Sequence, residues 1–154
     1  DLFATLADIL GQGKKLPAGA GEDSFSFLSA LQGKIVEKPL RPFTIHHSIN
    51  GSFAIRRGPW KLALCPGSGG WSAPRPGRSD MTKVPPIQLF NLKNDPGETD
   101  NLQAAYPDRV ARMKNILSDI ISNGRSTPGP KLKNDAEIVM IKPIPKSRPK
   151  PKKK

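Results

Sequence analysis

The middle of the chain alternates apolar and polar residues with the two-residue period of a β-strand. The first alternating run ends at Asn50-Gly51, a pair that tolerates the positive φ angles of a tight hairpin turn. The alternating segments are residues 43–49, 52–56, 60–64 and 87–92. We therefore expect a small antiparallel sheet of about four strands, with a long loop at residues 65–86 before the last strand.

The first part of the chain has the three- to four-residue apolar spacing of helices. In residues 1–10 we expect Asp1 to be the N-cap and Gly11 to end the helix. A shorter helix should follow, capped by Asp23 or Ser24. The apolar residues of the two helices are Leu2, Phe3, Leu6, Ile9 and Leu10, and then Phe25, Phe27, Leu28 and Leu31.

A longer helix is expected after the last strand. Pro107 suits a first helical position, and Asn123-Gly124 suits a helix end. Its apolar stripe consists of Val110, Met113, Leu117, Ile120 and Ile121. The sequence thus predicts an α+β fold, in which the antiparallel sheet packs against this C-terminal helix and further helices precede the sheet.

The positive charge is concentrated near the C-terminus. The net charge of the chain is +12, and residues 131–154 contribute +7 of it through 9 Lys or Arg and 2 Asp or Glu. Alternating Lys and Pro cannot form a helix or a central strand, so we expect a disordered, solvated tail. An electrostatic anchor to polyanions is the functional alternative. The tail has no aromatic residue on which bases could stack, so we do not expect nucleic acid as a partner.

Cysteine content and hydropathy exclude other classes. Cys65 is the only cysteine of the chain, so neither an internal disulfide nor a cysteine-based metal site can form. No stretch approaches the roughly 20 apolar residues of a membrane span. We also expect no signal peptide at the start of this sequence.

The sequence DPGE at residues 95–98 joins the last strand to the C-terminal helix. Aspartate can cap such a turn, proline presets φ, and we expect Gly97 to take the backbone conformation that other residues resist. Asp100 or Asn101 should then hydrogen-bond free backbone groups ahead of the helix. The turn by itself predicts a structural joint without catalytic chemistry.

This joint also carries a family resemblance. "LFNLKNDPGETDNL" resembles the signature near the C-terminus of sulfatases of the arylsulfatase type, members of the alkaline-phosphatase-like superfamily. "DLFATLADILG" looks like the helix that closes their large α/β domain, and "GSFAIRRGPWKLAL" looks like one of their hairpins. "CPGSGGWS" and "NGRSTPGP" are similar to a bacterial branch. The resemblance runs from Asp1 to about Glu137 and implies the C-terminal portion of a sulfatase.

The resemblance implies chemistry that this sequence does not contain. Sulfatases convert the Cys or Ser of Cys/Ser-x-Pro-x-Arg to formylglycine, which attacks the sulfate ester beside a calcium ion. Cys65 does not fit, because Pro66 follows it directly and Gly69 stands where arginine is required. Asp100-Asn101 has no further carboxylates suitably placed, so we assign it no calcium. We expect no catalytic or metal-binding residue here, and an inactive chain without the missing N-terminal sulfatase domain.

The resemblance also implies that this portion lines the pocket for a sulfate ester, either a sulfated carbohydrate or an aryl sulfate. The candidate substrate contacts are His46, His47, Ser68 and Trp71. Adjacent strand residues face opposite sides, so at most one histidine should reach a pocket; a structural role is the alternative for either. Trp71 suits stacking on a sugar or packing within its loop. Arg56 and Lys61 suit ion pairs, or contacts to sulfate.

These inferences divide the chain into segments. Residues 1–33 should end the large α/β sulfatase domain, 34–42 form a linker, 43–130 form the C-terminal subdomain, and 131–154 form the basic tail. By family analogy the protein is periplasmic or secreted. Without the large domain, the apolar residues of the first two helices should be exposed, which predicts low solubility.

Two other interpretations stay open. The chain could be a non-catalytic basic module that binds polyanions such as sulfated glycans through its tail. It could also belong to a phosphoester-cleaving enzyme of the same fold superfamily, with Ser or Thr as the nucleophile elsewhere. The nucleophile motif of the upstream sequence would separate these interpretations from a sulfatase.

Overall fold

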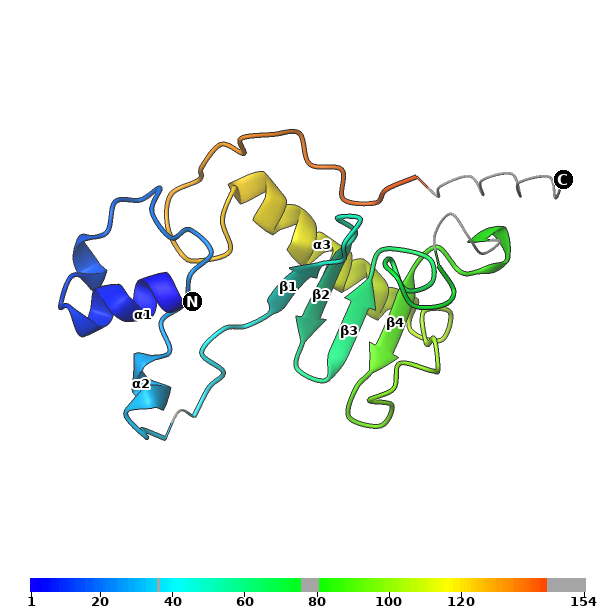
Figure 1. Ribbon diagram of the computed structural model, residues 1–154, viewed down its shortest axis with the longest axis horizontal. Coiled ribbons are helices and arrows are strands. Elements are labelled where there is room, and N and C mark those ends of the chain that lie inside the picture. The colour runs from blue at the N-terminus through cyan, green and yellow to red at the C-terminus, as the bar shows by residue number, and fades with distance from the viewer. Residues whose placement is uncertain (36, 76–80, 144–154) are drawn as a thin grey trace, which may run out of the picture. The chain divides into compact units, whose positions relative to one another are not determined.

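The computed structural model of the chain describes residues 1–35, 37–75 and 81–143 (Figure 1). The helices are α1 (Leu2–Ile9), α2 (Leu28–Leu31) and α3 (Pro107–Asn123), with short 3₁₀ turns at Gly13–Lys15 and Met81–Lys83. The strands are β1 (Thr44–His47), β2 (Phe53–Arg57), β3 (Trp60–Ala63) and β4 (Gln88–Asn91). The expected α+β fold, with four antiparallel strands and a C-terminal helix, is confirmed.

The described chain forms two compact units. One consists of residues 1–42 and 115–138, and the other of residues 43–114 with the segment that starts at Val139. The second unit therefore opens where the expected linker ends, and it contains the whole sheet. The basic tail that we expect to be disordered, residues 131–154, includes residues 144–154, which lie outside the described residues.

The sheet is a simple meander in the order β1-β2-β3-β4, with each strand antiparallel to its neighbour. Its register creates two adjacent rows of residues across the strands, one on each face. The core row consists of Ile45, Ile55, Leu62 and Leu89. The pocket row consists of His46, Ala54, Ala63 and Gln88.

The core row supplies much of the buried apolar surface. Ile55, Leu62 and Leu89 are each 0% exposed. Burial of such a side chain contributes about 1.5–3 kcal/mol relative to an exposed one. This face is therefore the one that stabilises the sheet, and the opposite face is free to carry polar groups.

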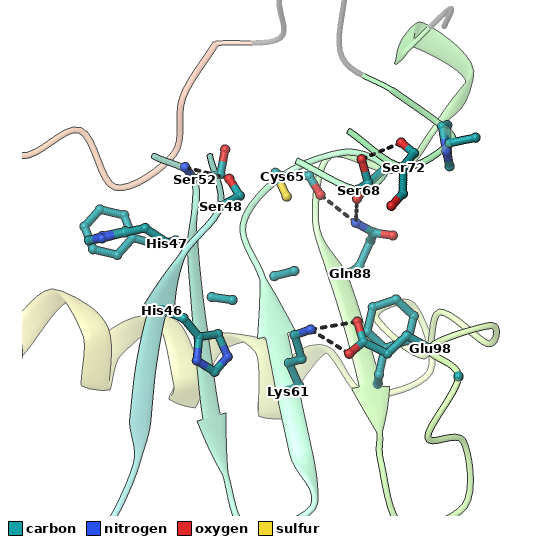
Figure 2. A pocket seen from close by; sticks show the side chains of 18 of the residues that line it. His46, His47, Ser48, Ser52, Lys61, Cys65, Ser68, Ser72, Gln88 and Glu98 are labelled. Carbon is teal, nitrogen blue, oxygen red and sulfur yellow. Dashed lines mark hydrogen bonds and ion pairs between the residues drawn. The ribbon is translucent and has the colours of Figure 1, made fainter. Parts of the chain in front are cut away.

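The first half of α3 lies on the side of the core row. The Arg109 guanidinium is 4.2 Å from the centroid of the Trp60 ring, and Trp60 also contacts Tyr106 with ring centroids 5.1 Å apart. Trp60 shares its face with the core row, because it lies two residues before Leu62 on β3. Residues 107–114 of α3 belong to the same unit as the sheet and lie behind it in Figure 2, with the pocket side chains in front. The predicted start of this helix at Pro107 and its end at Asn123 are both confirmed.

The N-terminal helices differ in part from the prediction. Asp1 is the N-cap residue of α1 but makes no capping hydrogen bond; its carboxylate accepts one from the Phe25 N–H and pairs with Arg41. Ser24 does not cap α2, which starts four residues later; its hydroxyl accepts from the Ala4 N–H, 2.9 Å away. The prediction that Asp23 or Ser24 caps α2 was wrong, because the N-cap residue is Phe27 and the Ser24 hydroxyl instead satisfies the first turn of α1.

The apolar stripe of α1 is exposed. Leu2, Phe3, Leu6 and Ile9 are 62%, 50%, 49% and 55% exposed, whereas the buried residues of the helix are Thr5 and Ala7. This agrees with the expectation that the stripe has no partner within the chain. Within the described residues, no helix combines the length and the apolar character needed to cross a membrane.

Candidate functional site

The face of the sheet opposite the core row carries a pocket of about 560 Å³ (Figure 2). The pocket row and the neighbouring side chains of Lys61 and Phe90 form its floor. Loop residues 65–74 close one end, and the turn at residues 96–98 closes the other. All lining residues belong to the unit that contains the sheet.

An ion pair occupies the end of the pocket next to the turn. The Lys61 Nζ donates to both carboxylate oxygens of Glu98, at 2.6 and 2.8 Å. The two side chains are 22% and 35% exposed, so the pair is partly shielded from water. Of the ion-pair and sulfate interpretations of Lys61, the structure shows the ion pair.

The backbone of Glu98 explains how its carboxylate reaches Lys61. Glu98 has a φ of +56°, a left-handed conformation that is rare for residues other than glycine. We expected Gly97 to take this conformation, and that prediction was wrong: within the described residues, the positive φ angle of this turn falls on Glu98. Backbone strain of this kind persists only where surrounding contacts enforce it, and here the contact to Lys61 is one of them.

Asp95 and Asn101 hold the turn from both sides. The Asp95 carboxylate accepts from the N–H groups of Asp100 (2.9 Å) and Thr99 (2.8 Å). These bonds, first that of Asp100, lower the pKa of Asp95 below its ordinary value. The Asn101 Oδ1 accepts from the Leu89 N–H at 3.0 Å, which fastens the chain ahead of α3 to the edge of β4. The predicted joint is confirmed.

His46 lies on the floor of the pocket beside Lys61 (Figure 2). Burial lowers the pKa of His46 below its ordinary value of 6.5, and the nearby Lys61 lowers it further, while Glu98 acts in the opposite direction. The imidazole is therefore neutral at pH 7. Within the described part of the chain, no hydrogen bond engages its two nitrogens, so it offers one donor and one acceptor to a ligand.

His47 lies at the rim of the same pocket. It faces the other side of β1, where its ring meets its cross-strand partner Phe53 with centroids 4.1 Å apart at 72°. The expectation that at most one histidine points toward a pocket is therefore not contradicted. His47 is still a lining residue, because β1 ends at His47 and β2 begins at Phe53, at the rim of the pocket.

The glycine-rich loop closes the other end of the pocket. The Gln88 Nε2 donates to the carbonyls of Cys65 (2.8 Å) and Gly67 (2.7 Å), which ties the loop to β4. The Ser68 hydroxyl donates to the Ser72 carbonyl at 2.7 Å. Of the four predicted contacts, His46, His47 and Ser68 line the pocket, whereas Trp71 is 74% exposed and is not among the lining residues.

Cys65 also lines the pocket, but its chemistry is that of a buried thiol. Burial raises the pKa of Cys65 above its ordinary value, although Ser52 and Lys61 act in the opposite direction. A thiol with a raised pKa is a poor nucleophile at neutral pH. Elsewhere in the described residues, no three His, Cys, Asp or Glu side chains come together as a metal site.

Gln88 and the pairing of Glu98 with Lys61 were not predicted as parts of a site. The alternation of the last strand could have placed Gln88 on the face opposite Leu89. Glu98 had no such signal, because its position depends on an unexpected left-handed backbone.

Proteins of related sequence and solved structures with a similar fold show the family to which the chain is related. The chain is 30% identical over 123 residues to N-acetylgalactosamine-6-O-sulfatase from Bacteroides thetaiotaomicron, a match that covers 78% of this chain and 22% of that protein. The chain is thus homologous to the sulfatases. No family model matches it.

Solved structures agree with this relationship. A sulfatase structure from work on glycosaminoglycan metabolism by Bacteroides thetaiotaomicron matches with a TM-score of 0.59 and 30% identity, over 78% of this chain and 24% of that one. A candidate sulfatase from Bacteroides fragilis matches with a TM-score of 0.51 and 17% identity, over 78% and 23%, and shows the shared fold alone. The chain therefore spans about a quarter of the length of the relatives it matches.

Proposed function

We propose that this chain serves as the C-terminal portion of a sulfatase and forms part of the wall of its substrate pocket. The observation that carries the proposal is the pocket on the open face of the sheet, in a segment homologous to sulfatases. His46, His47 and Ser68 are the proposed substrate contacts. Trp71 remains a candidate contact only for a ligand that extends beyond the pocket.

The proposed reaction is the hydrolysis of a sulfate ester, with a sulfated carbohydrate as the favoured substrate class. One relative is an N-acetylgalactosamine-6-O-sulfatase, which supports a sulfated amino sugar. Formylglycine would supply the nucleophile and calcium the electrostatic stabilisation, both from other parts of the enzyme. Export to the periplasm or the medium belongs to the same proposal.

A chimera tests this role. This chain replaces the matched C-terminal segment of the Bacteroides thetaiotaomicron sulfatase, and hydrolysis of N-acetylgalactosamine 6-sulfate is measured. We expect the chimera to retain hydrolysis and the chain alone to show none. A folded chimera that neither binds nor hydrolyses the substrate, or an isolated chain that turns it over, would contradict the proposal.

The basic tail supports a second candidate function, the binding of polyanions. Residues 131–154 contribute +7 to the net charge, and the Lys142 Nζ donates to the Asn50 carbonyl at 2.5 Å. Removal of residues 143–154 should weaken binding to heparin and flatten its salt dependence. Unchanged binding after truncation would rule this function out.

A further inference from the structure

The charged groups of the pocket neutralise each other. Among its described lining residues, the charged side chains are Lys61 and Glu98, and both oxygens of the carboxylate accept from the same ammonium group. A sulfate group that approached Lys61 would meet the Glu98 carboxylate at the same place. It would therefore have to displace a carboxylate from its partner before it gained a contact.

Glu98 is fixed in that position. Its left-handed backbone, with φ at +56°, belongs to a turn held by the Asp95 carboxylate through the N–H groups of Thr99 and Asp100. These bonds fix the backbone from which the Glu98 side chain reaches Lys61. The turn therefore presents the carboxylate to Lys61 at the place where a sulfate group would have to bind.

The free hydrogen-bonding groups of the floor are uncharged. His46 is a neutral imidazole with an open donor and an open acceptor in the described structure. The Nε2 of Gln88 is committed to the Cys65 and Gly67 carbonyls, so its Oε1 is the atom left to accept from a ligand. A sugar hydroxyl or amide N–H can donate to the open acceptors of both groups, whereas a sulfate ester has only acceptor oxygens and can pair with the imidazole N–H alone.

Small apolar side chains form the floor of the pocket between His46 and Gln88. In the pocket row, Ala54 and Ala63 are the residues between His46 and Gln88. Strands lie about 4.8 Å apart, so three spacings separate the His46 and Gln88 backbones by about 14 Å. Two methyl groups between polar ends leave a shelf on which the C–H face of a sugar ring can lie.

We propose that the pocket row binds the uncharged part of a sugar, its ring face on the two alanines and its hydroxyl or acetamido groups at His46 and Gln88. This recognition rests on the proposed sulfatase function and deepens it: the chain selects the sugar, whereas the sulfate group lies elsewhere in the enzyme. The Lys61/Glu98 pair excludes sulfate from this end of the pocket.

The test is an NMR titration of the full chain with N-acetylgalactosamine and, separately, with sodium sulfate. In the wild-type chain, the sugar should shift the amide resonances of the pocket row in the millimolar range, and sulfate should not. Ala54→Leu fills the shelf and should weaken sugar binding at least tenfold. Thr44→Leu is the matched control, because Thr44 lies on the same face of the sheet but outside the pocket.

Glu98→Gln provides the complementary variant. It removes the carboxylate that holds Lys61, so sulfate should now shift the resonances around Lys61, while sugar binding changes less than threefold. Sulfate binding at Lys61 in the wild-type chain would overturn the inference, as would unchanged sugar affinity in Ala54→Leu.

The wild-type titration also separates this inference from the proposed function. If neither probe shifts the pocket resonances, the pocket row is not a sugar shelf. Hydrolysis by the chimera described above would then still uphold the sulfatase role. If the chimera loses hydrolysis while the chain still binds the sugar, the inference about the pocket row stands and the sulfatase role is contradicted.

Discussion

The two faces of the sheet are built from the same four strands, and adjacent residues on each strand serve different purposes. The core row has three residues that are 0% exposed, and its members are all aliphatic. The pocket row, one residue further along β1 and β3, has polar ends and an alanine centre. Because side chains alternate between faces, adjacent residues of one strand have different roles: one stabilises the core and the next faces the pocket.

The separation extends to the elements that cover each face. On the core side, Trp60 contacts Arg109 of α3 and Tyr106, the residue before this helix. On the pocket side, the loop that Gln88 holds and the turn that carries Glu98 close the two ends of the pocket. Substitutions on the core row should therefore change folding, and substitutions on the pocket row should change binding.

The largest difference is expected between two neighbouring residues of β3. Leu62→Ala creates a cavity in the core row and should lower the free energy of unfolding by about 2–5 kcal/mol. Ala63→Ser, on the other face, should change it by less than about 0.5 kcal/mol. Urea denaturation followed by circular dichroism measures both. Equal losses for the two variants would show that the faces do not differ as described.

The ion pair should have an intermediate effect. Lys61→Met leaves the Glu98 carboxylate partly buried without its partner, and we expect a loss of about 1–2 kcal/mol, between the values of exposed and buried pairs. Lys61→Met combined with Glu98→Gln should recover more than half of this loss, because no charge is then left unpaired. A double-mutant cycle by urea denaturation gives the coupling; additive losses would mean that the pair contributes nothing.

The sequence predicted the sheet, α3 and the joint because these depend on local patterns. Alternation placed the four strands, Pro107 marked the start of α3, and Asp95 and Asn101 accept from the nearby N–H groups of Thr99 and Gln103. Such signals act between residues close in sequence. They can therefore be recognised from the sequence alone.

The rest of the site depends on contacts distant in sequence. Lys61 and Glu98 lie 37 residues apart, and their pairing needs both the strand register and the left-handed turn. Asp23 or Ser24 was predicted to cap α2, and Ser24 instead accepts from Ala4, 20 residues away. The position of His47 at the rim depended on where β1 ends. No local pattern contains this information.

Asp95 allows a test of the joint through pH. The pKa of Asp95 is lowered in the folded chain from an ordinary value of 3.8. The carboxylate therefore stabilises the fold fully above this unfolded pKa. This contribution is lost as the pH falls through the lower folded pKa. Asp95→Asn should therefore flatten the acid side of the stability curve. Thermal melts from pH 6 to pH 2 measure this, with Asp108→Asn as the control on the first turn of α3. Parallel curves for the wild type and Asp95→Asn would contradict the assignment.

The smallest expected effect is a shift in the titration of His46, and it compares the effects of Lys61 and Glu98 on the imidazole. Its pKa is lowered by burial and by Lys61 and raised by Glu98, so Lys61→Met should raise the pKa and Glu98→Gln should lower it further. Because the folded pKa lies below the unfolded value of about 6.5, stability is lost as the pH falls from about 6.5 to the folded value, and His46→Gln should remove this loss. The C2 proton of His46 reports the pKa by NMR. Shifts of the same sign in the two variants would contradict the opposite effects assigned to Lys61 and Glu98.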